Sequence, residues 1–272
     1  MKTRGESVRP IIALLTDFGL RDPYVAQVKA VILSYCRDAA IIDVTHEISA
    51  FNELQAAFIL KINAPYMPPG TIHVSVIDPG VGSKRRSIII ETRRGDIFIG
   101  PDTGFMIPAA EELGINAVYV IDDSKLPPRI SETFHARDVF APVAGMIASG
   151  KDVRELGREV SDYVRFKLPE PKISEDEIGV TVMHVDRFGN VITNLKSRES
   201  PLRVGERIRV SMKDKEITCE FVKSYAYMGV GEPLLTIGGS GYVEFSINRG
   251  SAAERFGLRP GDKLRLIRLT TH

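Results

Sequence analysis

The sequence predicts an α/β protein, in which an N-terminal, largely parallel sheet flanked by helices precedes a C-terminal antiparallel β-barrel domain. Strand and helix patterns alternate through the first half, whereas short runs rich in β-branched residues and separated by turn signals fill the second half. A polar stretch with two prolines, residues 151–177, lies between them and is typical of a linker. We therefore expect residues 1–165 to form the α/β domain and residues 166–272 the β-barrel domain.

The elements of the first half follow from its apolar runs and their periodicity. Apolar runs predict strands at residues 10–15, 39–44, 72–77, 87–92, 97–100 and 117–121. Helical periodicity predicts helices at residues 23–34, 53–62, 104–113 and 137–149. Pro23 is well suited to the first turn of the first helix. This alternation is typical of a sheet whose two faces are both covered by helices.

The second half contains closely spaced strand patterns. We expect strands at residues 178–185, 191–193, 207–210, 216–222, 234–237, 242–247 and 263–267. Strands at this spacing favour an antiparallel barrel or sandwich.

The composition of the 272 residues limits the function classes. The chain has 43% hydrophobic and 26% charged residues, as an ordinary soluble protein does, and its net charge of +1 disfavours binding to nucleic acid or to anionic lipid. Cys36 and Cys219 are far apart and lack metal-ligand spacing. The charged segment 1–10 lacks the apolar core of a signal peptide, and no run is long enough for a membrane span. We expect a cytoplasmic protein.

Three carboxylates follow predicted strands at Gly- and Pro-rich turns. Asp17, Asp78 and Asp102 each stand where an apolar run ends. Ligands of open α/β sheets bind outside the carboxyl ends of the strands, so these acids face the expected pocket. They indicate either a site for sugar hydroxyls or a cation site, although each acid could also serve only as a turn or cap residue. Asp22 and Tyr24 follow the turn that carries Asp17 and open the next predicted helix.

Two further segments carry polar side chains at turns. His135, at the start of a predicted helix, could orient or activate a reacting group, or be structural. In the second half, Phe188 could lie against a flat base, and Asn190 could both donate to and accept from an adenine edge. The same residues could also form an ordinary hairpin turn. The chain has neither Gly-x-Gly-x-x-Gly nor a Walker loop, which disfavours a phosphate cradle.

Taken together, these segments resemble the S-adenosyl-L-methionine (SAM) hydroxide adenosyltransferase family, the adenosine-forming SAM hydrolases related to fluorinase and chlorinase. The matching motifs, in chain order, are LLTDFGLRDPYVAQVK, DVTHEISAF, VIDPGVGSKRR, GPDTG, FHARD, HVDRFGNVITN and GSGYVEFSINRGSAA. They extend from Leu14 to Ala253, so the resemblance covers nearly the whole chain.

The resemblance implies an enzyme that hydrolyses SAM to adenosine and L-methionine, by attack of water or hydroxide on C5′ of the ribose. It implies a homotrimer with the site at the subunit interface, SAM as substrate, and neither a cofactor nor a metal. The catalytic residues that it implies are Asp78, Arg85 and His135. The substrate-binding residues that it implies are Asp17, Phe18, Asp22, Tyr24, Phe51, Asp186, Phe188, Asn190, Ser240, Ser251 and Ala252.

The chain departs from the family pattern at two positions. Thr103 stands where the family usually has Asn, and Ala136 where it usually has Gly. Asp78 stands where the halogenating relatives have tyrosine, which favours water over halide.

The alternatives to SAM hydrolysis are a SAM-dependent halide transferase, a SAM or adenosine sensor without turnover, and a metal-dependent hydrolase built on the three strand-end acids.

Overall fold

The computed structural model describes residues 9–269, and the chain divides into two compact units whose boundary falls between Lys167 and Leu168. The charged segment 1–10, which we expect not to be a signal peptide, lies outside the described residues except for Arg9 and Pro10. Within residues 9–269, no helix has both the length and the apolar character needed to cross a membrane.

The first unit is built on a seven-stranded sheet with the strand order β2-β1-β3-β5-β4-β6-β7. Its strands are β1 (Ile11–Thr16), β2 (Ala40–Thr45), β3 (Ile72–Val76), β4 (Ser87–Thr92), β5 (Ile97–Pro101), β6 (Ile115–Ile121) and β7 (Gly157–Glu159). The neighbours β2-β1-β3-β5 run parallel, whereas β4, β6 and β7 pair antiparallel. The carboxyl ends of β1, β3 and β5 therefore meet at one edge of the sheet.

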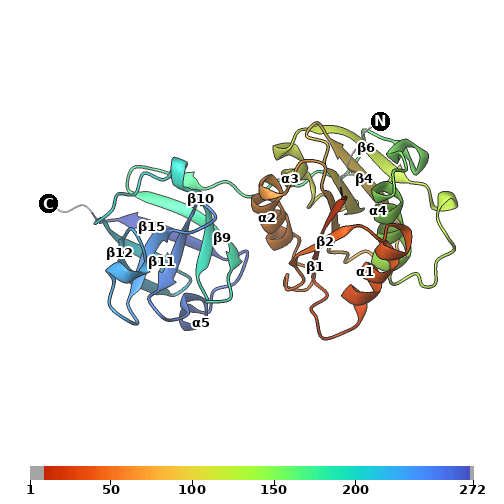
Figure 1. Cartoon of the computed structure of the whole chain (residues 1–272). Helices are drawn as coiled ribbons and strands as arrows, with labels where there is room; N and C mark the ends of the chain where they lie inside the picture. The colour runs from red at the N-terminus through yellow and green to blue at the C-terminus, as the bar shows by residue number, and fades with distance from the viewer. Residues whose placement is uncertain (1–8, 270–272) are drawn as a thin grey trace, which may run out of the picture. The chain divides into compact units, whose positions relative to one another are not determined.

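Helices cover both faces of this sheet (Figure 1). The α-helices are α1 (Tyr24–Tyr35), α2 (Glu53–Asn63), α3 (Ile107–Glu112) and α4 (Ala141–Ala148), and a π-helix, η3 (Ala136–Phe140), leads directly into α4. Short 3₁₀ turns are η1 (Ala64–Tyr66), η2 (Asp123–Lys125) and η4 (Val153–Glu155). Helix α1 packs against α4, and α2 packs against α3.

The apolar pattern of the strands explains this layering. Ile12 and Leu14 of β1 belong to the core cluster that also contains Val28 of α1 and Val143 of α4, and all of them are buried. Gly145 allows the close approach of α4 to α1, because a Cβ there would lie 2.7 Å from the Cβ of Tyr35.

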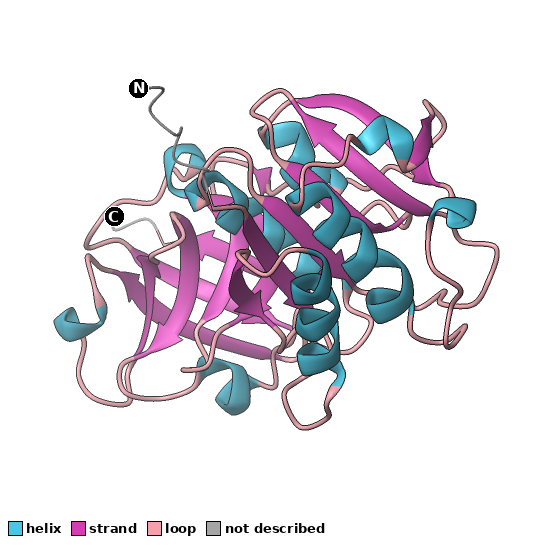
Figure 2. Ribbon diagram, turned by 45° about the vertical axis from the view of Figure 1, so that its right-hand side comes forward, coloured by secondary structure: helices cyan, strands magenta, loops and turns pink. Residues whose placement is uncertain are grey.

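The second unit is a closed seven-stranded barrel. Around the barrel the strands are β9 (Glu177–Val185), β10 (Val191–Lys196), β14 (Tyr242–Ile247), β13 (Pro233–Ile237), β12 (Lys215–Phe221), β11 (Arg207–Met212) and β15 (Lys263–Arg268), and β8 (Lys172–Ile173) pairs with β9 from outside. Figure 2 shows these strands curving around a common interior, which apolar side chains fill. Short helices η5 (Ser197–Glu199), η6 (Tyr225–Tyr227) and α5 (Ala252–Phe256) lie in the connections.

The structure confirms the predicted fold class and corrects three elements. The expected linker 151–177 contains β7, the edge strand of the first sheet, whose three mostly exposed residues carry no apolar signal. The expected helix 104–113 begins only at Ile107, because Gly104 has a positive φ of 91° and Pro108 occupies the first turn. The expected helix 137–149 is divided into the π-helix η3 and α4.

Candidate active site

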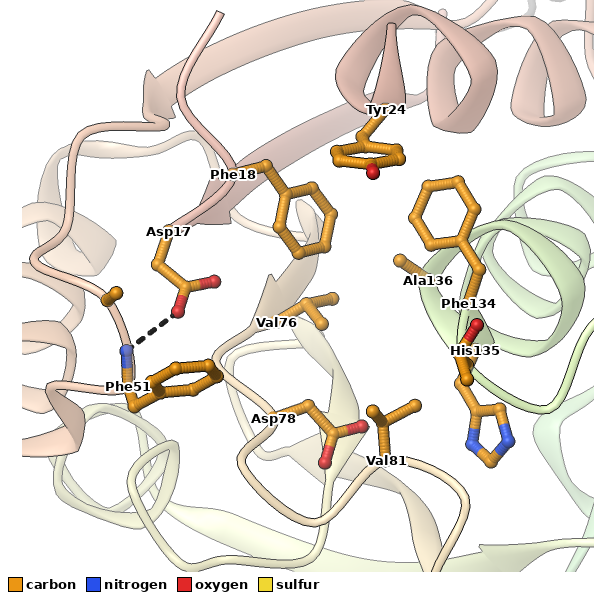
Figure 3. Close-up of a pocket in the computed structure, with 12 residues that line it drawn as sticks. Asp17, Phe18, Tyr24, Phe51, Val76, Asp78, Val81, Phe134, His135 and Ala136 are labelled. Carbon is orange, nitrogen blue, oxygen red and sulfur yellow. Dashed lines mark hydrogen bonds between the residues drawn. The ribbon is translucent and has the colours of Figure 1, made fainter. Parts of the chain in front are cut away.

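A cavity of about 280 Å³ lies at the carboxyl ends of β1 and β3, in the first unit (Figure 3). It is lined by carboxylates, an imidazole, aromatic rings and small side chains, namely Asp17, Phe18, Tyr24, Ala50, Phe51, Val76, Asp78, Val81, Thr133, Phe134, His135 and Ala136. Asp17 directly follows β1, and Asp78 comes two residues after β3. The parallel strands thus bring these two predicted acids to one cavity.

Asp78, Arg85 and His135 form one buried cluster at this cavity. Arg85 and Asp78 make a bidentate ion pair, in which Nε donates to Oδ1 over 3.0 Å and Nη2 donates to Oδ2. Nη2 also lies 3.0 Å from Nδ1 of His135. Asp78 and His135 line the cavity, and Figure 3 shows the Asp78 carboxylate pointing toward the side where His135 lies.

The guanidinium of Arg85 is fully engaged within the protein. Besides its bonds to Asp78 and His135, Nη1 donates to the carbonyl oxygen of Arg86 and to Oγ of Ser87, each over 2.9 Å. An arginine side chain has five N–H donors, so these contacts use all of them. Arg85 therefore fixes the direction of the Asp78 carboxylate and has no donor left for a ligand.

The contact with Arg85 also determines the tautomer of His135. A guanidinium can only donate, so Nδ1 accepts, and the neutral imidazole carries its proton on Nε2. Nε2 is buried and has no hydrogen-bond partner within residues 9–269, although Oε2 of Glu132 lies 3.7 Å away. Burial lowers the pKa of His135, and the positive charges of Arg129 and Arg85 act in the same direction.

Asp138 holds the loop that precedes His135. Its Oδ2 accepts hydrogen bonds from the backbone N–H groups of Ile130 and Ser131, over 3.0 and 2.8 Å, and the carboxylate also pairs with Arg137. Burial raises the pKa of Asp138, but these hydrogen bonds outweigh it and hold the pKa below its ordinary value. The FHARD motif thus supplies three cavity residues, Phe134, His135 and Ala136, together with the carboxylate that orders the adjacent loop.

Asp17 lies on the opposite wall of the cavity. Its Oδ2 accepts a hydrogen bond of 2.8 Å from the backbone N–H of Phe51, a residue with an unusual positive φ of 61° (Figure 3). Burial raises the pKa of Asp17, and repulsion from Asp78 adds to this effect against the hydrogen bond from Phe51. The charge of Asp78 therefore acts on the Asp17 carboxylate in the same cavity.

Aromatic rings form the apolar part of the wall. The ring of Phe134 lies 5.9 Å from that of Phe18 and 5.2 Å from that of Tyr24, both edge to face. Phe134 belongs to the FHARD motif but was not among the residues predicted to bind substrate. Ala136, at the position where the family usually has Gly, also lines the cavity.

Not all predicted residues reach this cavity. Asp22 is exposed and is not part of the lining. Asp102 is buried, and its carboxylate pairs with Arg86 and accepts from the backbone N–H of Val164. The three strand-end acids therefore do not converge, and within residues 9–269 no group of three or more His, Cys, Asp or Glu side chains is arranged to hold a metal.

A second cavity, of about 760 Å³, lies in the barrel unit. It is lined by Asp186, Phe188, Asn190, Tyr225, Ile247, Asn248, Arg249, Gly250 and Ser251. Of the residues predicted here, Asp186, Phe188, Asn190 and Ser251 line it, whereas Ser240 and Ala252 do not.

The turn that carries Phe188 is held by Asp186. Oδ1 of Asp186 accepts from the backbone N–H groups of Phe188 and Asn190, and Oδ2 accepts from Nδ2 of Asn190. Phe188 is 75% exposed, so its ring is available to lie against a planar group. Gly189, between Phe188 and Asn190, has a φ of 81°, and a Cβ there would lie 2.0 Å from Oγ of Ser251.

Tyr225 is the residue of this cavity that the sequence did not indicate, because it comes from a short 3₁₀ turn without a recognisable pattern. Its hydroxyl donates to Oε1 of the buried Glu244 over 2.5 Å. Burial and the bond to Glu244 raise the pKa of Tyr225, and burial raises the pKa of Glu244.

Comparison with known proteins gives consistent matches along the chain. Residues 12–157 match the SAM hydroxide adenosyltransferase N-terminal domain, and residues 180–265 match the C-terminal domain of the same name. A protein of Methanocaldococcus jannaschii named (R)-S-adenosyl-L-methionine hydrolase is 37% identical, over 96% of this chain and 97% of its own length. A fluorinase of Actinopolyspora mzabensis is 26% identical, over 96% and 98% of the two chains. The crystal structure of an uncharacterized conserved protein from Thermotoga maritima superposes with a TM-score of 0.89 at 32% identity, covering 94% of this chain and 100% of that one.

Proposed function

The chain belongs to the SAM hydroxide adenosyltransferase family, and we propose that it is an enzyme that hydrolyses SAM to adenosine and L-methionine. The observation that carries the proposal is the Asp78–Arg85–His135 cluster at the cavity of the first unit. A protein that only binds SAM has no need for a carboxylate held in one direction by a fully engaged guanidinium.

The proposed reaction is attack of a water molecule on C5′ of the SAM ribose. The C5′–O bond forms while the C5′–S bond breaks, and the sulfonium leaves as the neutral thioether of methionine. The leaving group therefore needs neither a general acid nor a metal ion. The protein has to hold one water in line with the C5′–S bond, remove its proton and exclude other water.

We assign the proton to Asp78. Arg85 uses all of its donors within the protein, so it acts by orienting Asp78 and not by touching the water. Nδ1 of His135 is occupied by Arg85, and in the neutral ring Nε2 already carries a proton. Asp78 is then the group of the cluster with lone pairs free to accept the proton, and His135 completes the support of Arg85.

The remaining residues are proposed to bind the substrate. Asp17, opposite Asp78, accepts hydrogen bonds from the ribose hydroxyls, and the aromatic wall contacts the apolar part of the nucleoside. In the barrel unit, Phe188 lies against adenine and Asn190 contacts its edge, while Asp186 fixes the turn that carries both. Asp22, Ser240 and Ala252 line neither cavity, so their proposed contacts depend on the family resemblance.

We also propose that the enzyme is a homotrimer, in which the first unit of one subunit and the barrel unit of its neighbour complete each site. Two open cavities with exposed aromatic side chains at their edges, Phe51 at 66% and Phe188 at 75%, support this proposal, because a neighbouring chain would cover both. The two free thiols, Cys36 and Cys219, favour a cytoplasmic location.

The direct test is incubation of the purified protein with SAM in water enriched in heavy oxygen, followed by chromatography and mass spectrometry. We expect equal amounts of adenosine and methionine, with the heavy oxygen in the 5′-hydroxyl of adenosine. Turnover should not change when a chelator is added. Binding of SAM without products would support a sensor, and 5′-chloro-5′-deoxyadenosine in the presence of chloride would support a halide transferase.

A further inference from the structure

His46 lies behind the cavity wall and holds both ends of the turn that carries Asp17. The His46 side chain is 2% exposed, and its Nδ1 lies 2.8 Å from the hydroxyl of Thr16 at the end of β1. Its backbone carbonyl accepts a 2.7 Å hydrogen bond from the N–H of Gly19. Asp17 is located between these two attachment points, although His46 itself is not part of the cavity lining.

The directions of these hydrogen bonds follow from the chemistry of the groups. Nε2 of His46 lies 3.0 Å from Oδ1 of Asp43, in an ion-pair contact that does not have hydrogen-bond geometry; since a carboxylate would repel a nitrogen lone pair at this distance, Nε2 carries a proton. In the neutral ring Nδ1 then accepts from the hydroxyl of Thr16. The same hydroxyl oxygen accepts from the backbone N–H of Phe18 over 3.2 Å. A chain of contacts therefore runs from Asp43 through His46 and Thr16 to the backbone of Phe18, the residue after Asp17.

The outer end of this chain is fixed by a second ion pair. Nζ of Lys29, on α1, lies 2.5 Å from Oδ2 of Asp43, on β2. Burial raises the pKa of Asp43, but the bonds from Lys29 and His46 outweigh it and hold the pKa below its ordinary value. Asp43 is thus a charged acceptor that keeps the imidazole in one orientation.

We propose that His46 is a positioning residue for Asp17, acting through the hydroxyl of Thr16, so that the ribose meets a carboxylate whose direction is already fixed. The hydrogen bond from Phe51 holds one oxygen of Asp17, and the chain through Thr16 holds the backbone from which this carboxylate projects. Preorganisation of this kind strengthens binding because less freedom is lost when the ligand arrives. The inference rests on the proposed function of Asp17 in ribose binding.

The test compares two ligands, adenosine and 2′,3′-dideoxyadenosine, by calorimetry on the full chain. The ratio of their affinities isolates the contribution of the ribose hydroxyls from that of the base. In Thr16→Val, which keeps the shape and loses the hydroxyl, we expect this ratio to fall by about tenfold, the size of one hydrogen bond to a charged group. In Thr16→Ser, which restores the hydroxyl, the ratio should return to within about twofold of wild type.

Thr45→Val is the matched control. Thr45 ends the neighbouring strand β2, and its hydroxyl accepts from the N–H of Glu47 and not from the Asp17 turn. The same substitution there should leave the ratio unchanged. If Thr16→Val does not fold, as judged by its thermal transition, Asp43→Ala decides: it removes the carboxylate beside Nε2 of His46 and should lower the ratio in the same direction.

The outcomes separate this inference from the proposed function. If the wild type binds both ligands equally, Asp17 does not bind ribose, and the proposed function loses its ribose site. If the wild type prefers adenosine but Thr16→Val, or Asp43→Ala in its place, keeps the full preference, the ribose site stands and the positioning role of His46 is overturned. A merely structural role would weaken both ligands equally and leave the ratio unchanged, which also overturns it.

Discussion

The position of Arg85 shows how much a single side chain can determine at this site. It comes seven residues after Asp78, beyond a tight turn, and it returns to form the bidentate pair with that carboxylate. Its remaining donors bind the carbonyl oxygen of Arg86, the hydroxyl of Ser87 and the imidazole of His135. The cluster is therefore assembled around the guanidinium, and Asp78 is its proposed reactive member.

Substitution of Asp78 by Asn tests this assignment. The amide keeps the size of the side chain but cannot take a proton from water, so we expect kcat to fall by about 10²- to 10⁴-fold. The affinity for adenosine should change by less than about threefold, since Asp78 is not proposed to bind the ribose. Single-turnover kinetics and calorimetry check the two quantities. A variant with near wild-type turnover would remove Asp78 from the mechanism.

The pH dependence of adenosine binding tests Asp17. A carboxylate accepts two ribose hydroxyls, whereas the protonated acid does so poorly, so affinity should fall as the pH decreases through the pKa of Asp17. Because burial raises this pKa, the loss should begin at a higher pH than for an aspartate with an ordinary pKa. Calorimetry at stepwise lower pH measures the effect, and Asp17→Asn should abolish it. Affinity that stays constant throughout this range would contradict the assignment.

At the residue scale, the sequence placed Asp17 and Asp78 at one cavity, but it also selected Asp102, which does not line that cavity, and it did not predict the contacts of these acids. Asp17 and Asp78 could be predicted because both follow strands, and parallel strands end at one edge. Asp102 follows a strand in the same way, yet Arg86 and Val164 occupy its carboxylate. Such contacts join residues far apart in the chain, so neither spacing nor residue type reveals them.

At the scale of elements, the turn from Asp186 to Asn190 combines two constraints at one glycine. Gly189 has a positive φ and lies against Ser251, the residue that caps α5. The turn is thereby packed against the start of α5, and this packing fixes the position of Phe188 in the turn.

The substitution Gly189→Ala should therefore destabilise the barrel unit by about 1–3 kcal/mol, since strained backbone and steric overlap add. Gly205→Ala is the matched control, because Gly205 also has a positive φ, 89°, but within residues 9–269 no atom beyond its own chain neighbours lies within 4 Å of a Cβ built there. Only the backbone effect remains in the control, about 1 kcal/mol. Denaturant titration compares the two variants, and equal losses would show that the contact with Ser251 is unimportant.

Strands were predicted more completely than helices. β14 was predicted with the bounds that the structure has, because its apolar run is bounded by glycines and a turn. The π-helix η3 has no sequence signal, since its apolar residues also fit a regular helix. β7 was missed because pairing with β6, and not its own residues, makes it a strand.

At the scale of the whole molecule, the two cavities described above lie one in each compact unit. Each contains part of the proposed machinery: the water-orienting cluster in the first unit, and the proposed adenine-binding turn in the barrel. The sequence predicted the fold classes found in the two halves of the chain, because the strand spacing of the halves differs. Their assembly rests on the proposed trimer.

Complementation between two inactive variants tests this assembly. Chains carrying Asp78→Asn and chains carrying Asn190→Ala are each expected to be inactive at limiting SAM, because every site contains one defective half. In mixed trimers formed by coexpression, about a quarter of the sites would combine two intact halves from different chains. Adenosine formation should therefore reappear. No recovery in trimers verified by mass would indicate that each site is built from one chain.

The π-helix after His135 gives the chain a constraint on length as well as on residue type. A π-turn holds one residue more than an α-helical turn, and successive helical residues are separated by about 100° around the axis. Loss of a single residue from η3 would preserve each side chain of the cluster, yet it would rotate the imidazole away from the guanidinium. In divergent relatives, we therefore expect a one-residue deletion within the π-helix to go together with loss of the proposed SAM hydrolysis, even where every motif is intact.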